Sequence, residues 1–168
     1  MRIRDPGVEA LGLERYAIPG DGACGPNSYL VSAGTVDHSV FNEGSLLSRP
    51  QVLLTQYARR ALLEMRAIRL RVVQAMCDER NHLLYSNAGE YDLFDVDKSH
   101  HCVPGTFKVH VARSFIQDTQ WTQCRHWKAM AVSEQRDIAV GQVCHDCTLP
   151  TVHFIAISRY LNCCLNHR

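Results

Sequence analysis

The segment that begins at Pro50 carries the longest amphipathic pattern in the chain and constrains the fold most strongly. Its apolar side chains recur at spacings of three and four residues, at Leu53, Leu54, Tyr57, Ala61, Leu62, Met65, Ile68, Val72 and Met76. Such spacing places the side chains on one face of an α-helix. The sequence therefore predicts a long helix from Pro50 to Met76, with that face buried in the core.

Arginines are frequent on the same segment, at positions Arg59, Arg60, Arg66, Arg69 and Arg71. They are spread around the predicted helix rather than stacked in one stripe, which favours a solvated outer face. The whole chain carries 18 Lys and Arg against 17 Asp and Glu, a formal net charge of +1. Neither the placement nor the balance of charge favours nucleic acid or an acidic membrane surface as a partner.

The chain has 168 residues, of which 46% are hydrophobic, enough for a single globular domain over 1–168 with a buried core. No apolar run approaches the roughly 18 residues that a membrane helix requires, and the N-terminus lacks the apolar stretch of a signal peptide. We therefore expect an unsecreted, cytoplasmic, monomeric protein with no membrane partner. The eight cysteines are expected to stay reduced in that compartment.

A glycine-rich turn precedes a single cysteine in the segment Ile18-Pro19-Gly20-Asp21-Gly22-Ala23-Cys24-Gly25-Pro26. Pro26 suits the first turn of a helix, so Cys24 is predicted at a helix N-terminus. Unpaired N–H groups and the helix dipole at that end favour a thiolate and lower the pKa of a cysteine. Backbone N–H groups can also point at an oxyanion, here from Asp21, Gly22, Ala23 and Cys24. The alternative is a turn ahead of a buried structural cysteine.

A nucleophilic thiol needs a base, and His153 is the best placed of the nine histidines. It lies near the start of a predicted strand, Val152–Ile157, where an imidazole is held rigidly enough to face a helix N-terminus. His145, in the preceding predicted loop Gly141–Thr151, is the reserve candidate. Taken alone, a histidine in such a strand is more often a core residue.

Other elements are predicted from shorter patterns. The expected helices after the irregular stretch Asn81–Val111 cover Val109–Ile116 and Trp121–Ser133, with both tryptophans in the core, and Ile138–Val140 is expected to be a strand. Cys144-His145-Asp146-Cys147 has the two-residue spacing of a zinc chelate. It has no second well-spaced pair and no surrounding thioredoxin-like pattern, so we predict neither a metal site, nor a redox dithiol, nor any cofactor.

At these motifs the sequence resembles the ovarian-tumour (OTU) family of cysteine proteases, most of whose studied members remove ubiquitin or ubiquitin-like proteins. The resemblance covers about 14–158. The segment that ends in Asp21-Gly22-Ala23-Cys24 matches the nucleophile motif of the family, and His153-Phe154 matches its final motif. A middle motif of tryptophan, alanine and an Ile-x-Val strand is matched by Trp121, Ala129 and Ile138-Ala139-Val140 at the expected offsets.

The resemblance implies an α+β fold with a small mixed sheet between helical layers. It also implies a thiol-dependent deubiquitinase with Cys24 as nucleophile and His153 as base. The sulfur and an imidazole nitrogen are then expected within about 4 Å of each other. The family often places Asp or Asn two residues after the histidine, whereas this chain has Ile155. Asp21 is the preferred candidate to orient the imidazole, Asp146 is another, and a Cys-His dyad is the remaining option.

Two further functions stay open. Thr122, His126 and Ile155 depart from the family pattern and motivate a catalytically inactive OTU-like module that binds ubiquitin without cleaving it. Gly25, Pro26 and Asn27 replace the usual Leu-Phe/Tyr-Arg that follows the cysteine. The short, divergent form also fits a polyprotein-processing protease of a virus or mobile element, with the same chemistry on another substrate. The Cys-Gly-Ser/Ala-Cys signature of papain-like enzymes is absent from the sequence.

Overall fold

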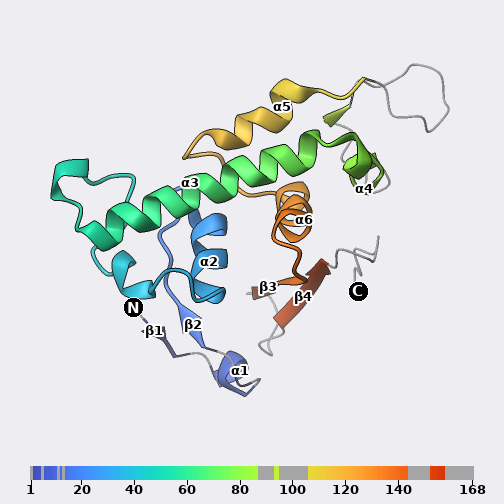
Figure 1. Ribbon diagram of the computed structural model, residues 1–168. Helices are drawn as coiled ribbons and strands as arrows, with labels where there is room; N and C mark the ends of the chain where they lie inside the picture. Colours follow the sequence, from blue (N-terminus) through green and yellow to red (C-terminus); the bar gives the residue numbers. More distant parts are fainter. Residues whose placement is uncertain are drawn as a thin grey trace.

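One long helix, α3 (Gln56–Cys77), runs through the computed structural model, and other helices pack on two sides of it (Figure 1). The structure describes residues 2–4, 6–10, 12, 14–86, 93–94, 106–143 and 152–157. Helices α2 (Cys24–Ser32) and α6 (Cys124–Ser133) lie on one side of α3, and α5 (Val109–Arg113) lies on the other. The side chains of α3 therefore contact segments that come from both halves of the chain.

Shorter elements lie before, between and after these helices. The helical ones are α1 (Pro6–Glu9), α4 (His82–Ser86) and the 3-10 turns η1 (His38–Phe41), η2 (Gln51–Leu53), η3 (Glu79–Asn81) and η5 (Ser114–Ile116). The strands are β1 (Arg2–Ile3), β2 (Arg15–Tyr16), β3 (Ile138–Val143) and β4 (Val152–Ile157). Among the described residues no helix is both long and apolar enough to cross a membrane.

The expected α+β architecture, with a mixed sheet between helical layers, is wrong for the described part of the chain. That part is predominantly helical, and its strands form only two separate antiparallel pairs, β1 with β2 and β3 with β4. The side chains around α3 bury one another without a sheet between them. Helix-on-helix packing is thus the architecture of the core.

Helix α3 begins at Gln56, six residues later than the sequence pattern predicted. The hydroxyl oxygen of Thr55 accepts a hydrogen bond from the backbone N–H of Ala58 at 3.2 Å, which caps the helix. Pro50 instead precedes the 3-10 turn η2, after which the chain is extended at Leu54. Leu53 and Tyr57 were expected in the core, but each is 72% exposed.

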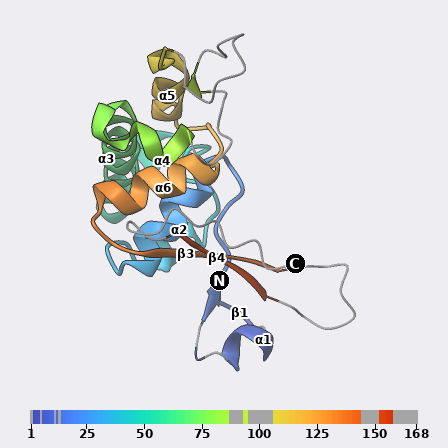
Figure 2. The same ribbon diagram turned by 90° about the vertical axis from the view of Figure 1, so that its right-hand side faces the viewer.

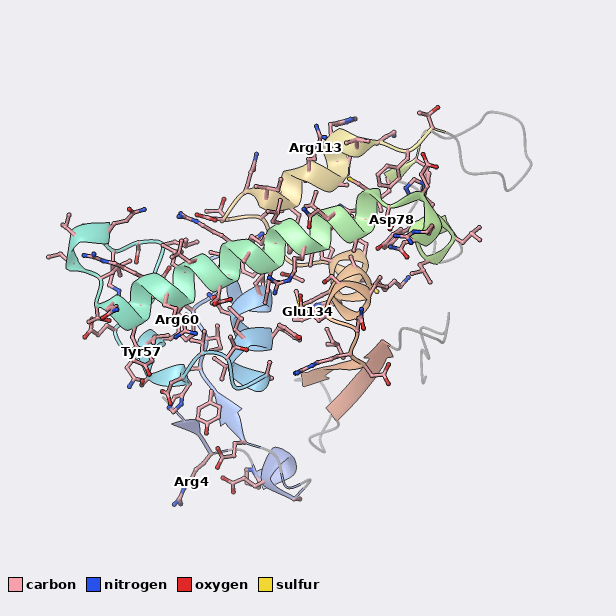
Figure 3. The ribbon with its side chains drawn as sticks, in the orientation of Figure 1. Arg4, Tyr57, Arg60, Asp78, Arg113 and Glu134 are labelled. Atoms are coloured by element: carbon pink, nitrogen blue, oxygen red, sulfur yellow. The ribbon has the colours of Figure 1, made fainter. Side chains whose placement is uncertain are left out.

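The core surrounds the buried face of α3. Its members on that helix are Ala58, Ala61, Leu62, Met65, Ile68, Val72, Val73 and Met76. Against them pack Leu30 from α2, Phe115 from η5 and Met130 from α6, all at most 2% exposed. Glu134 lies at the end of α6 (Figure 3). Its Oε1 forms an ion pair at 2.7 Å with Nε of Arg71 on α3, at the edge of the core.

Helix α2 ends at Ser32, and Gly34 closes its C-terminus. The N–H of Gly34 donates to the carbonyl of Val31, and the N–H of Thr35 donates to the carbonyl of Leu30, both at 3.0 Å. This is a Schellman motif, and it requires a left-handed residue that glycine supplies at φ +70°. The helix begins at Cys24, as expected. Residues close in the sequence therefore define both ends of α2.

Helix α6 begins at Cys124 and not at Trp121. The ring Nδ1 of His126 accepts the backbone N–H of Gln123 at 2.9 Å and so caps the helix with a buried imidazole. Trp121 was predicted in the core but is 57% exposed, whereas Trp127 packs against the core. At the other end Gln135 adopts a left-handed φ of +52° without being glycine.

The β3–β4 pair confirms the two predicted late strands. Ile138 pairs with Ile157, and Gln142 pairs with His153. Strand β3 continues to Val143, three residues into the segment predicted as a loop. The pair lies on the side of α2 and α6, away from α5, and β4 contacts α6 (Figure 2).

Candidate functional site

Cys24 is the first residue of α2, and its side chain is half-buried. The residue before it, Ala23, caps the helix without a side-chain hydrogen bond. The first helical hydrogen bond runs from Asn27 N–H to Ala23 O at 3.0 Å, and Pro26 has no N–H. The helix start therefore has the N–H groups of Cys24 and Gly25 next to the sulfur, and both favour the thiolate.

The pKa of the Cys24 thiol is nevertheless raised above its ordinary value, contrary to the sequence-based expectation. Burial is the largest cause, and the negative charge of Asp21 adds to it. The backbone N–H of Gly25 and the charge of Arg69 act in the opposite direction but do not prevail. Desolvation of a thiolate thus outweighs the helix terminus here.

Asp21 holds the turn before Cys24. Its Oδ1 accepts the N–H of Ala23 at 3.0 Å, and its Oδ2 accepts the hydroxyl of Ser45, a residue of the loop between η1 and η2. The hydroxyl of Ser45 in turn accepts the N–H of Leu47 at 3.1 Å. While these bonds are in place, the Ala23 N–H is occupied and is not offered to an oxyanion.

Arg69, from the middle of α3, ties three segments together, although the sequence pattern predicted a solvated side chain. The residue is 0% exposed. Its Nη2 lies 2.8 Å from Gly22 O, 2.9 Å from Asp118 O and 3.0 Å from Gln120 O, and its Nη1 donates to Phe115 O at 2.9 Å. The guanidinium therefore binds the turn before Cys24 to the loop that follows η5.

The Arg69 guanidinium lies over the ring of Phe115, which in turn stacks on the ring of His126. Arg69 Cζ is 4.5 Å from the centroid of the Phe115 ring, within the range of a cation–π contact. Phe115 stacks on the buried His126 with ring centroids 3.9 Å apart. Burial lowers the pKa of Arg69, and the charges of Asp118 and Asp21 act the other way. His126, which departs from the OTU pattern, thus has a packing and capping role.

Two glycines allow the loop after η5 to lie directly on the turn. A Cβ at Gly22 would lie 2.0 Å from the carbonyl oxygen of Thr119, and Gly22 has a φ of +84°. A Cβ at Gly25 would lie 2.1 Å from Oγ1 of Thr122. Only glycine fits at these positions without moving the loop. The turn and the loop are packed as one unit around Arg69.

The predicted base is described only in part. His153 lies on β4, opposite Gln142, but the position of its side chain falls outside the described residues, as do His145 and Asp146 entirely. The expected Cys24–His153 distance and the role of Asp146 therefore stay predictions. The described residues contain no group of three His, Cys, Asp or Glu side chains that could hold a metal ion. Cys144 and Cys147 lie outside that part of the chain.

A separate pocket of about 380 Å³ lies between η1 and the start of α3. It is lined by residues that include Asp37, Glu43, Arg49, Thr55 and Tyr57. None of its lining residues belongs to the turn before Cys24 or to the loop after η5. We therefore do not assign this pocket to the candidate site.

Sequence reasoning missed Arg69 and Ser45 as parts of the site. For Arg69 a signal was present, because it lies four residues after Met65 and three before Val72, in phase with the buried face of α3. An arginine at such a position needs hydrogen-bond acceptors inside the protein. Ser45 carried no comparable signal, since it lies in an irregular loop 24 residues after Asp21.

Comparison of the chain with models of known protein families, with curated proteins and with solved structures found no match. The resemblance to the OTU family therefore depends on the motif residues alone.

Proposed function

We propose that this protein is a thiol-dependent isopeptidase that acts on conjugates of ubiquitin or a ubiquitin-like protein through Cys24. The observation that carries the proposal is the position of Cys24 at the start of α2, behind a turn held from both sides. Arg69 binds the Gly22 carbonyl, and Asp21 binds the Ala23 N–H. A nucleophile on such a preorganised turn loses little entropy on reaching its reactive geometry.

In the proposed reaction, the Cys24 thiolate attacks the carbonyl carbon of the C-terminal glycine of the conjugate. The N–H groups of Cys24 and Gly25 donate hydrogen bonds to the resulting oxyanion. An imidazole, assigned to His153, first accepts the thiol proton and then donates it to the leaving lysine amine. Water hydrolyses the thioester and frees Cys24.

The raised pKa of Cys24 makes the base necessary rather than optional. Because burial favours the neutral thiol, little thiolate forms at neutral pH without a proton acceptor. Asp21 is committed to Ala23 and Ser45, so its carboxylate acts in holding the turn. We propose a Cys24–His153 dyad as the minimal machinery.

The same raised pKa favours a second candidate, a module that binds ubiquitin without cleaving it. A half-buried cysteine that stays a thiol suits a structural residue as well as an unactivated nucleophile. The departures from the OTU pattern at Thr122, His126 and Ile155 fit this candidate. A polyprotein-processing protease would share the chemistry of the first proposal and differ only in substrate.

A ubiquitin with an electrophile at its C-terminus separates these candidates. It should label the wild-type protein and Cys77→Ala, a control at another half-buried cysteine, but not Cys24→Ala. His153→Ala should reduce labelling strongly at neutral pH. Labelling that persists in Cys24→Ala would place the nucleophile elsewhere. Binding of ubiquitin, with no labelling and no cleavage of any di-ubiquitin linkage, would establish the second candidate.

A further inference from the structure

The pocket between η1 and the first turn of α3 has a volume of about 380 Å³. Small-molecule sites in proteins usually have volumes of roughly 300–1,000 Å³. The apolar part of its lining consists of Val40, Tyr57 and Ala58. Ala58 is buried in the core, whereas Tyr57 is largely exposed at the N-terminal end of α3 (Figure 3). The pocket therefore offers a ligand an apolar surface that includes one aromatic ring.

Arg49 is the one cation among the described residues that line this pocket, and it is already paired within the protein. Its Nη1 forms an ion pair with Glu43, and its Nη2 donates to the carbonyl of Val40 at 3.1 Å. Its Nε is buried. Glu43 thus neutralises the charge of the guanidinium, and both terminal nitrogens have partners inside the protein.

The carboxylate of Asp37 is the charge that remains in the lining. Its Oδ1 accepts the backbone N–H of Ser39 at 2.8 Å. Hydrogen bonds from the hydroxyl and then the backbone of Ser39 hold the pKa of Asp37 below its usual range. Nδ1 of His38 lies 3.8 Å from Oδ1 of Asp37, and this histidine carries charge only when protonated. A carboxylate can accept about four hydrogen bonds, so acceptor capacity is left at Asp37.

The start of α3 also borders the pocket, and the N-terminus of a helix favours negative charge nearby. The protein meets that preference with its own groups. The hydroxyl of Thr55 accepts the N–H of Ala58 at 3.2 Å, and Asp37 and Glu43 supply two carboxylates. An anionic ligand would have to enter beside both carboxylates. The charge of the lining therefore favours a cation.

We propose that this pocket binds a primary alkylammonium group. The ammonium donates hydrogen bonds to Asp37, and the alkyl chain lies against Val40 and Tyr57. An ammonium has N–H donors and no acceptor, which complements a lining whose spare polar capacity is a carboxylate. A cation close to a tyrosine ring gains a further electrostatic attraction. The inference does not depend on the thiol chemistry of Cys24, because no lining residue belongs to the turn before it.

A titration of the isotope-labelled protein with n-butylammonium, followed by NMR, tests the proposal. At constant ionic strength, the backbone N–H signals of Ser39 and Ala58 should shift and reach saturation. Butyrate has a similar chain and the opposite charge, and it should leave both signals unchanged. Binding of butyrate as tight as that of n-butylammonium would overturn the proposal.

Two substitutions locate the site. Asp37→Asn should weaken binding about tenfold through the loss of a charge-assisted hydrogen bond. Asparagine keeps a side-chain oxygen for the N–H of Ser39, so η1 retains its cap. Tyr57→Leu, at an exposed position, should weaken binding about threefold. The control Glu79→Gln removes an exposed carboxylate in η3, outside the pocket, and should bind as the wild type does. Equal affinities of Asp37→Asn and Glu79→Gln would overturn the assignment.

The alkylammonium can belong to a free amine or to a lysine side chain in a peptide, and a second titration distinguishes these sources. It uses acetyl-Gly-Lys-Gly-amide and the same peptide acetylated on its lysine. Tighter binding of the lysine peptide than of n-butylammonium would identify a peptide lysine as the ligand, and weaker or equal binding would identify a free amine. The acetylated peptide has lost the charge and should not bind. Binding of both peptides with the same affinity would overturn the role of the ammonium.

Discussion

Arg69 Nη2 donates to the carbonyl oxygen of Gly22 at 2.8 Å, which joins the middle of α3 to the turn before Cys24. A residue of the central helix thus holds the turn that precedes the candidate nucleophile. The same guanidinium reaches the loop that carries Trp121. Stability of the core and geometry of the site are therefore coupled through one side chain.

Replacing Arg69 tests this coupling. We expect Arg69→Met to lower the free energy of unfolding by about 3 kcal/mol, because buried carbonyl groups of Gly22, Phe115, Asp118 and Gln120 lose their donor. Urea denaturation measures the change. The control Arg60→Met, at an exposed position of the same helix (Figure 3), should stay within about 0.5 kcal/mol of the wild type. Equal effects of the two substitutions would contradict the role assigned to Arg69.

Gly22 and Gly34 offer a matched pair for the packing of the turn. Both have a positive φ, but a Cβ at Gly22 meets Thr119 O at 2.0 Å while a Cβ at Gly34 has no atom within 4 Å. Gly34→Ala should therefore cost only the backbone strain, about 1 kcal/mol. Gly22→Ala should cost about 3 kcal/mol because the loop must also move. Thermal or urea unfolding of both variants measures the difference, and similar costs would refute the close packing.

Gln135 is a position where a substitution should stabilise the protein. It occupies the left-handed residue that follows α6, with φ +52°, and Arg136 N–H closes the motif on Ala131 O at 3.1 Å. Glycine relieves the strain there, so Gln135→Gly should raise the free energy of unfolding by about 1 kcal/mol. The opposite sign is expected for Gln74→Gly, at an exposed site inside α3, which should lose about 1 kcal/mol.

The pH dependence of Cys24 alkylation tests its electrostatics. Because burial and then the charge of Asp21 raise the pKa of Cys24, the rate with iodoacetamide should keep rising above the pH at which an ordinary thiol has ionised. Asp21→Asn removes the charge, lowers the pKa and should speed alkylation at neutral pH. Cys77 serves as the internal control. Burial raises its pKa and the charge of Arg113 lowers it, so its alkylation should not respond to Asp21→Asn. A profile of Cys24 unchanged in Asp21→Asn would contradict the argument.

Much of the helical structure could be predicted because its causes are local. The apolar spacing along α3 follows from the helical period, and the start of α2 at Cys24 follows from residues within a few positions. The strand Val152–Ile157 was likewise predicted from its β-branched and aromatic residues. The helix boundaries were predicted less accurately, since α3 is capped by Thr55 and does not begin at Pro50.

The expected mixed sheet was wrong, although the short strands late in the sequence pattern agreed with the motif resemblance from which it was taken. Short strands near the end of the chain do form, but β3 pairs with β4, and β1 pairs with β2, within the described residues. Which strands pair depends on contacts between distant segments, and a motif does not encode them. The position of Cys24 at the start of α2 does not depend on which strands pair.

The sequence by itself determined the local features of this protein: the amphipathic face of α3, the glycine turn, and a cysteine as the first residue of a helix. Tertiary structure decided that Arg69, which lies in phase with the buried face of α3, is buried and that Trp121 is exposed, the reverse of what their types predict. The reason is long-range hydrogen bonding. Carbonyl groups from Gly22 and from the loop after η5 converge on one point of α3, where the buried guanidinium of Arg69 donates to them.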